Sequence, residues 1–244
     1  YVEDFARFAN FPLNQIQHLL ARLSRYGFIY YDFGLERFTV LPKLYNYVNA
    51  ASDLGDYDVI SFNSIIEQGQ YMTGDKHLVN AALDLKTKDL NILGVDEVVI
   101  TQARDVYLYP KDGLIVVKKN RNFLFNGQVF AGKLKLNGRE FAFNYDDFKI
   151  DLEYIDFFQL FEPIKPIKQD MYGNVLLTPL KTLIESAKGE LRIDDPGNRS
   201  GIRKDSFAIF PEFESFDECY VYYDGVYNRK DFSFRVDPFT LDSL

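Results

Sequence analysis

Short stretches in which apolar and polar residues alternate recur at nearly even intervals along the middle of the chain. Four of them begin at residues 89, 105, 122 and 140, so that each follows the previous one after 16 to 18 residues. An alternation with a period of two is typical of a β-strand that buries one face. The residues expected on the buried face are Leu90, Ile92, Val106, Leu108, Phe123, Phe125, Phe141 and Phe143. Those expected to face outward are Asn91, Tyr107, Leu124 and Ala142.

The even spacing favours a β-solenoid-like stack in which each short strand forms one rung. Two Asn-Gly pairs, Asn126-Gly127 and Asn137-Gly138, point to a different arrangement, because Asn-Gly between strand-like runs is a strong hairpin signal. With hairpins at these pairs, the body would be an antiparallel meander or a β-sandwich. Asn and Gly also suit the corners of a solenoid, where positive φ angles are needed. The solenoid is therefore the first prediction, and the antiparallel arrangement is the alternative.

The beginning of the chain has a helical pattern instead. Leucine and isoleucine recur at helical spacing between Pro12 and Gly27, and a shorter helix precedes them. Residues 28–40 predict two short strands with a turn between Asp32 and Glu36, and residues 42–51 predict a further helix. We therefore expect a helical, winged-helix-like element over residues 1–52 and a β-rich body over residues 53–244.

An order of helix, helix and wing is also found in DNA-binding elements. Residues 1–50, however, carry five Lys or Arg and four Asp or Glu, a balance of only +1. The predicted wing carries Tyr30, Tyr31 and Phe33 where phosphate-binding cations would be needed. The whole chain has a formal net charge of −8, which also opposes binding to phosphates. We predict a small packing element that binds no nucleic acid.

Composition supports the β-rich body and limits its chemistry. The chain has 23 Phe and 17 Tyr but no Trp, and these aromatic residues favour half-buried, pleated surfaces. Cys219 is the single cysteine, which excludes an internal disulfide framework and a Cys-rich metal site. There is no apolar run of about 20 residues, so no membrane span is predicted in this segment. Because the chain begins at Tyr1 without Met, we interpret it as a segment of a longer protein.

The sequence lacks the motifs that would mark an enzyme or a cofactor site. It contains no GxGxxG, no Walker phosphate loop and no nucleophile elbow. Carboxylates are plentiful, with Asp146-Asp147 and the pair Asp151 and Glu153 flanking one predicted strand. A glycosidase-like acid pair would require two such carboxyls to converge across a cleft. We predict no cofactor and favour a protein without enzymatic activity.

Two clusters are candidates for binding. Asp194, Asp195 and Asn198 lie close together in a turn-rich loop and could hold a calcium ion. Pro196 breaks the alternation of an EF-hand, and a solvated turn held by Asp and Asn side chains explains the same residues.

The second cluster consists of four tyrosines near the end of the chain, Tyr220, Tyr222, Tyr223 and Tyr227, which could stack on sugar rings. Alternation would place Tyr220 and Tyr222 on one face of a strand and Tyr223 on the other. Ordinary packing of a half-buried strand is the alternative explanation, since aromatic residues favour strands.

Several longer stretches resemble an interior region of very large, uncharacterised bacterial cell-envelope proteins. The stretches are residues 57–64, 119–127, 131–133, 141–152, 193–201, 220–224 and 236–242. The resemblance covers most of the chain and implies an exported, multi-module parent protein, located in the periplasm or at the cell surface. It implies no activity and no functional residues. The partners expected are other domains of the same parent, other envelope proteins, or glycans.

These observations predict a non-enzymatic structural or interaction module of a large extracytoplasmic bacterial protein. The alternative is a carbohydrate-binding or carbohydrate-processing β domain, which the aromatic strands and the abundant carboxylates would suit. A cleft that holds two facing carboxylates beside exposed tyrosines would favour the alternative.

Overall fold

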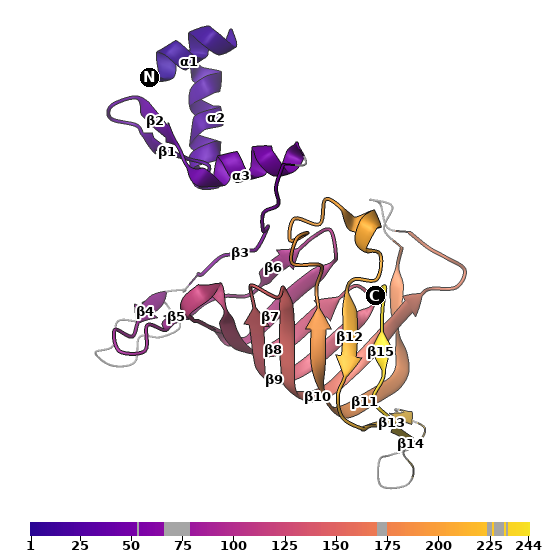
Figure 1. The fold of residues 1–244 in the computed structure, drawn as a ribbon. Coiled ribbons are helices and arrows are strands. Elements are labelled where there is room, and N and C mark those ends of the chain that lie inside the picture. The colour runs from indigo at the N-terminus through magenta and orange to yellow at the C-terminus, as the bar shows by residue number, and fades with distance from the viewer. Residues whose placement is uncertain (53, 66–78, 170–174, 224–225, 227–231, 233) are drawn as a thin grey trace. The chain divides into compact units, whose positions relative to one another are not determined.

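The computed structural model describes residues 1–244 except for residues 53, 66–78, 170–174, 224–225, 227–231 and 233 (Figure 1). The side chains of Ser186, Tyr222 and Tyr223 also lie outside the description. The chain divides into two compact units, Tyr1–Tyr57 and Asp58–Leu244. Each unit has its own cluster of buried apolar side chains.

The first unit contains the predicted order of helix, helix, two-stranded wing and helix. Its elements are α1 (Val2–Ala9), α2 (Leu13–Arg25), β1 (Ile29–Asp32), β2 (Arg37–Val40) and α3 (Pro42–Ala51). Helix α1 ends at Asn10, whose left-handed backbone (φ 54°) stops the helix before Pro12. The buried side chains come from α1, α2 and β1, which pack around Ile16 and Leu20. The helices and strands predicted for this region are confirmed.

The second unit is built on antiparallel strands. Its strands up to the middle of the unit are β3 (Ser61–Phe62), β4 (Ala81–Leu83), β5 (Leu90–Ile92), β6 (Val98–Thr101), β7 (Val106–Val117), β8 (Phe123–Ala131) and β9 (Leu134–Asn144). The remaining strands are β10 (Lys149–Pro163), β11 (Leu177–Arg192), β12 (Glu212–Ser215), β13 (Cys219–Tyr223), β14 (Phe234–Val236) and β15 (Thr240–Leu241). Two short 3-10 helices, Lys119–Arg121 and Lys204–Phe207, lie between strands.

The strands follow one another as a meander. The order across the sheet is β4, β5, β7, β8, β9, β10, β11, β13 and β14, and every pairing among the described strands is antiparallel. The long strands β7 and β11 each change partner along their length, to β6 and to β12 respectively (Figure 1). The predicted solenoid is therefore wrong, and the antiparallel alternative describes the sheet. The even spacing arises because strands of 9 to 12 residues are joined by short turns.

The alternating stretches bury the face that the sequence predicts. Seven of the eight predicted inward residues are buried, and Leu90 is half-buried against the same core. Phe123 stacks on Phe143 at 4.8 Å between ring centroids, and Phe125 meets Phe141 edge to face at 5.6 Å. Both are cross-strand pairs between β8 and β9. The core of the unit is thus a row of facing aromatic rings, which gain stabilisation beyond their buried area.

The two Asn-Gly pairs lie inside strands, so the prediction that they form turns is wrong. Asn126-Gly127 belongs to β8 and Asn137-Gly138 to β9, and Gly127 pairs directly with Gly138. The turn between these strands is instead formed by the two residues between Ala131 and Leu134. Glycine has no Cβ, so it can adopt the backbone conformations of a tight turn. The same property allows two strands to approach closely, which is its role at both positions here.

Truncation of Phe141 to alanine should lower the free energy of unfolding by about 3–5 kcal/mol, because a fully buried aromatic site is emptied. Asn91→Ala is the matched control, since Asn91 occupies an outward position of β5 and its removal should change stability by no more than about 0.5 kcal/mol. Urea unfolding of both variants measures the difference. Equal, near-neutral values would mean that the aromatic row does not form the core.

Candidate functional site

Extra residues interrupt the pairing of β7 and β9 with the strand between them, β8. Four residues of β7, 111–114, lie opposite the single residue Asn126. On the other side of β8, Arg139 and Glu140 of β9 lie opposite the same Asn126. The side chain of Asn126 holds this second bulge, because its Oδ1 accepts a 2.8 Å hydrogen bond from the backbone N–H of Glu140. Glu140 has a φ of 56°, the positive φ of a bulged strand.

Strand β10 carries two bulges at the same level of the sheet. Its residues Glu153 and Tyr154 lie opposite Lys188 of β11, and its residue Asp156 is inserted in the pairing with β9. Bulges bend a strand and redirect its side chains, and they occur often beside functional sites. The line of bulges therefore identifies the part of the sheet where the outer face is reshaped.

Glycines allow the strands to approach at this level. A Cβ on Gly127 would lie 2.2 Å from the carbonyl oxygen of Tyr109, and the φ of Gly127 is 136°. A Cβ on Gly138 would lie 2.0 Å from the carbonyl oxygen of Tyr154 and 2.7 Å from the ring of Phe141. Neither position has room for any side chain, so both glycines are required by the packing of backbone on backbone.

Two adjoining hollows of about 710 and 570 Å³ lie along the bulges, on the face of the sheet opposite the core. Both volumes fall in the range of ligand sites in proteins. We call the two hollows together the outer groove. Pro110, Ile155 and Ala187 contribute its aliphatic side chains. Its polar and aromatic side chains are those of Tyr109, Lys111, Asn126, Gln128, Asn137, Arg139, Glu153, Tyr154, Asp156, Glu185, Lys188 and Asp217. Arg139 and Asp156 line both hollows, and the groove runs across the strands from β7 to β11.

Two of the cations in the outer groove are paired with carboxylates. Arg139 Nη1 donates to Asp156 Oδ1 at 2.7 Å, and its guanidinium lies 4.8 Å from the ring centre of Tyr154. Lys188 Nζ donates to Glu153 Oε1 at 2.6 Å, and this hydrogen bond raises the pKa of Lys188. These exposed pairs contribute little to stability, but they leave the groove with mostly neutralised charge.

Uncharged polar groups, together with Lys111, line the other end of the outer groove. Tyr109, Gln128 and Asn137 are consecutive register partners on β7, β8 and β9, and all three line the same hollow. Within the described part of the chain, the side-chain amides of Gln128 and Asn137 make no hydrogen bond. Each amide offers two donors and a carbonyl acceptor. This end of the groove therefore presents hydrogen-bonding capacity that the protein itself does not use.

The ring of Tyr109 is held in a fixed position. Its hydroxyl donates to Glu97 Oε1 at 2.6 Å, and its edge contacts Phe130 at 5.4 Å between ring centroids. Burial, together with the hydrogen bond and the negative charge of Glu97, raises the pKa of Tyr109 to about 12. The phenol therefore stays protonated at neutral pH. Since 37% of the residue remains exposed, it offers a rigid aromatic surface beside the two amides.

The lining of the outer groove combines uncharged polar side chains with two ion pairs. Its described lining residues include no His, Cys or Ser, but they include carboxylates, lysines and tyrosines, which can also serve as general acids or bases. Two of its four carboxylates, Glu153 and Asp156, are engaged by Lys188 and Arg139. Of the other carboxylates considered for an acid pair, Asp147 accepts a hydrogen bond from Asn144 and Asp151 pairs with Lys149.

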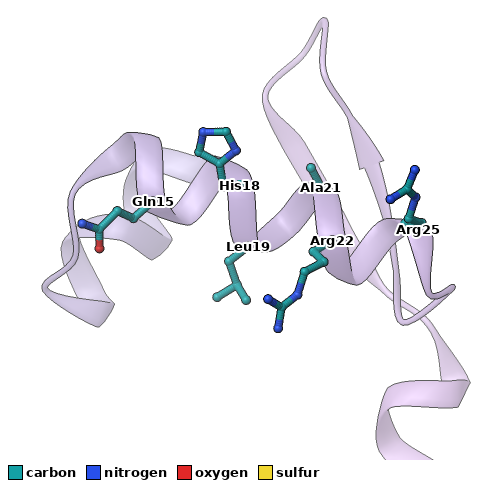
Figure 2. A pocket seen from close by; sticks show the side chains of 6 residues that line it. All are labelled: Gln15, His18, Leu19, Ala21, Arg22 and Arg25. Atoms are coloured by element: carbon teal, nitrogen blue, oxygen red, sulfur yellow. The ribbon is translucent and has the colours of Figure 1, made fainter.

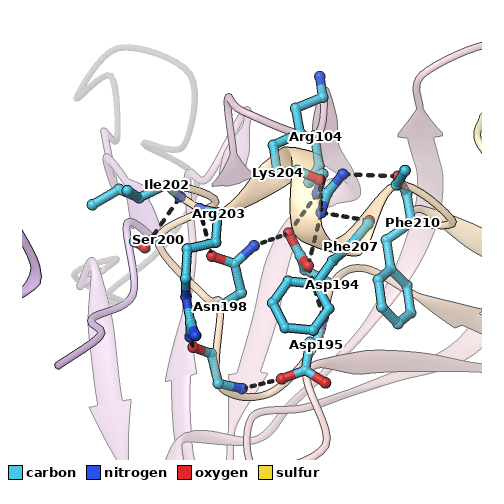
Figure 3. Close-up of polar contacts among 12 residues, drawn as sticks. Arg104, Asp194, Asp195, Asn198, Ser200, Ile202, Arg203, Lys204, Phe207 and Phe210 are labelled. Carbon is cyan, nitrogen blue, oxygen red and sulfur yellow. Dashed lines mark hydrogen bonds and ion pairs between the residues drawn. The ribbon is translucent and has the colours of Figure 1, made fainter. Parts of the chain in front are cut away.

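The predicted calcium ligands lie in a loop that a buried ion pair fastens to the sheet (Figure 3). Arg104 and Asp194 are both almost completely buried, and the guanidinium donates to both carboxylate oxygens of Asp194. Asn198 Nδ2 donates to Asp194 Oδ2 at 3.0 Å, and the backbone N–H of Asp195 donates to Oδ1 at 2.8 Å. Further donors of Arg104 reach the carbonyl oxygens of Phe207 and Phe210.

This arrangement explains the acidic loop as a structural element. Asp195 accepts from the backbone of Gly197 and Asn198 accepts from that of Arg203, which are bonds of a tight turn. A cation at Asp194 would have to displace the guanidinium of Arg104. Among the described residues, no three His, Cys, Asp or Glu side chains converge as metal ligands would.

The predicted tyrosine cluster is described only in part. Tyr220 is half-buried on β13, where it pairs in register with Glu185 of the outer groove and with Arg235 of β14. The backbones of Tyr222 and Tyr223 pair with Leu183 and Thr182, but their side chains lie outside the described residues, as does the whole of Tyr227. Tyr220 thus adjoins the groove, while the sugar-stacking role of the cluster stays a prediction.

Apart from Glu153 and the asparagines of the two Asn-Gly pairs, the residues of the outer groove were not singled out by the sequence. One pattern could have indicated them: several are polar residues that alternate with buried residues near the two Asn-Gly pairs. Alternation alone would have placed Gln128 and Asn137 on the outer face. Only the register of β7, β8 and β9 shows that these residues meet.

A different surface lies along helix α2 of the first unit (Figure 2). It is lined by Gln15, His18, Leu19, Ala21, Arg22 and Arg25. All six residues come from a single helix, so the surface is a helix face and not a cleft between elements. It would be the face that meets DNA in a winged-helix protein, and the prediction that the chain binds no nucleic acid stays a prediction.

Comparison with known proteins does not identify the chain: no protein-family model, no curated protein and no solved structure matches it. No helix in the described ranges is both long and apolar enough to cross a membrane. The function has therefore to be argued from the outer groove itself.

Asp194→Ala should lower the free energy of unfolding by about 3–5 kcal/mol, because it leaves the charge of Arg104 buried without a partner. Asp146→Ala removes an exposed carboxylate from another turn and should cost no more than about 0.5 kcal/mol. Both values can be obtained from urea unfolding curves. A small effect of Asp194→Ala would show that the loop is not anchored by this pair.

Proposed function

We propose that this chain is a non-enzymatic interaction module of a larger extracytoplasmic protein, and that it binds a glycan in the outer groove. The observation that carries the proposal is the set of register partners Tyr109, Gln128 and Asn137. They combine a fixed aromatic ring with two amides that have no hydrogen-bonding partner among the described residues.

The chemistry of sugars matches this combination. A sugar ring has an apolar face of C–H groups, which packs on an aromatic ring, and a rim of hydroxyls that both donate and accept hydrogen bonds. A side-chain amide also donates and accepts, so it can serve two neighbouring hydroxyls at once. The paired charges of Arg139 with Asp156 give the groove further polar groups without a strong net field.

The wide sheet is a suitable support for such a site. The side chains of the groove project from strands whose opposite face is packed against the aromatic core, so their positions are fixed on rigid elements. The exported parent protein that the sequence resemblance implies would bring the module into contact with cell-surface or environmental glycans. Both points support a binding role and neither requires catalysis.

A second candidate function is a contact with another protein through the first unit. Phe8 is 88% exposed and Phe11 is 58% exposed at the junction of α1 and α2. Exposed apolar side chains that gather on one surface often mark a protein contact. The structural or interaction role predicted from the sequence would then belong to residues 1–57, and it is compatible with a glycan site in the second unit.

Native affinity electrophoresis in gels that contain mannan, galactan, xylan or mixed-linkage β-glucan tests the glycan proposal. At least one of these neutral polysaccharides should retard the protein. The double variant Gln128→Ala/Asn137→Ala should lose about 1–3 kcal/mol of binding free energy, since each hydrogen bond contributes about 0.5–1.5 kcal/mol. Asn91→Ala, on the outward side of the sheet but away from the groove, should behave as the wild type.

Unchanged unfolding midpoints must first show that both variants are folded. Equal retardation of the wild type and the double variant would place binding outside the groove. No retardation by any of the four polysaccharides would reject the glycan proposal. Release of reducing sugars during incubation would contradict the non-enzymatic role.

A further inference from the structure

We infer that the ligand of the outer groove is a linear, uncharged oligosaccharide that lies across the strands and places successive sugar units against successive strands. This inference rests on the proposed function and adds to it the shape, the charge and the approximate length of the ligand.

The direction of the groove supports a ligand that crosses the strands. The first hollow is lined from β7, β8, β9 and β10, and the second from β9, β10 and β11. Neighbouring strands lie about 4.8 Å apart, so the four spacings from β7 to β11 cover roughly 19 Å. One strand spacing is close to the length of one sugar unit in an extended chain. The groove therefore has room for about four or five units.

The outward side chains repeat in step with the strands. Tyr109, Gln128, Asn137, Phe157 and Glu185 form one register row across β7, β8, β9, β10 and β11. Each strand thus contributes one polar or aromatic side chain at the same level. Aromatic residues stand at the β7 and β10 positions, and amides stand between them. Phe157, the aromatic residue on β10, is half-buried and lies outside the lining of the two hollows. A linear oligosaccharide that crosses the strands would pass one of these side chains at each strand.

The charges in the groove favour an uncharged ligand. An anionic ligand would need cations that are not already neutralised, but Arg139 is paired with Asp156 and Lys188 with Glu153. The lining carboxylates outnumber the lining cations by four to three, which also disfavours an anion. A uronic acid or a phosphorylated sugar beside Arg139 or Lys188 would therefore have to break an existing ion pair, and Lys111 is the one lining cation without an ion pair to a described residue.

An extended peptide is a poorer fit to the same surface. Peptides that add to a sheet pair with an edge strand and run along the strand direction. The outer groove lies instead on the face of five consecutive strands, and each of them pairs with strands on both sides. Strand β7 pairs with β5, β6 and β8, and β11 pairs with β10, β12 and β13. Outside the bulges their backbone groups are already used in pairing, so side chains provide most of the recognition.

Isothermal titration of the whole chain with a length series, from the monosaccharide to the hexasaccharide, tests the inference. The series is prepared from whichever neutral polysaccharide retards the protein in the gel. Affinity should rise at least tenfold between the disaccharide and the pentasaccharide and should level off beyond five units. A pentameric uronic acid oligomer should bind at least tenfold more weakly than the neutral pentasaccharide.

Three variants locate the ligand along the groove. Tyr109→Ala at the β7 end and Asn137→Ala in the middle should each lower the affinity for the pentasaccharide severalfold, whereas Asn91→Ala should leave it unchanged. Full affinity already at the disaccharide would overturn the inference and leave the glycan proposal standing, because it would mean one compact site. Tighter binding of the uronic acid oligomer would likewise overturn it. Retardation by no polysaccharide would reject both proposals together.

Discussion

The close approach of neighbouring backbones at Gly127 and Gly138 is the constraint on which the second unit depends. A side chain at either position would overlap a carbonyl oxygen of the adjacent strand, of Tyr109 or of Tyr154. Where the strands come this close, β7, β9 and β10 accommodate extra residues as bulges. These bulges bend the strands and redirect their outward side chains, which creates the outer groove.

The close approach of the strands at Gly127 and Gly138 affects both the core and the outer groove. The ring of Phe141 lies in the space that a side chain on Gly138 would fill, and that ring also packs edge to face on Phe125. Alternation then sends the next polar positions to the outer face, where Gln128 and Asn137 meet. The aromatic core therefore fixes the register of β8 and β9, and this register aligns the side chains that the proposed function requires.

Local patterns in the sequence predicted the helices and the buried faces of the strands, which depend on residues close together in the chain. The alternating stretches identified the buried face, and the helical spacing between Pro12 and Gly27 identified α2. The Asn-Gly pairs were misinterpreted because the residues indicate freedom of the backbone, while the presence of a turn depends on a partner strand elsewhere in the chain. The pairing of Arg104 with Asp194 joins residues 90 positions apart, and no local pattern shows it. The outer groove could not be predicted from the sequence for the same reason, since its residues meet only through the register of five strands.

The most direct test of the account is the response of side-chain amide resonances to a glycan in a ¹⁵N–¹H spectrum. Addition of the neutral oligosaccharide that binds most tightly should shift the side-chain amides of Gln128 and Asn137, because both would exchange water for sugar hydroxyls. The amides of Asn14 and Gln15 on α2 should keep their positions. Shifts confined to α2, with Gln128 and Asn137 unaffected, would contradict the account and place the ligand on the first unit.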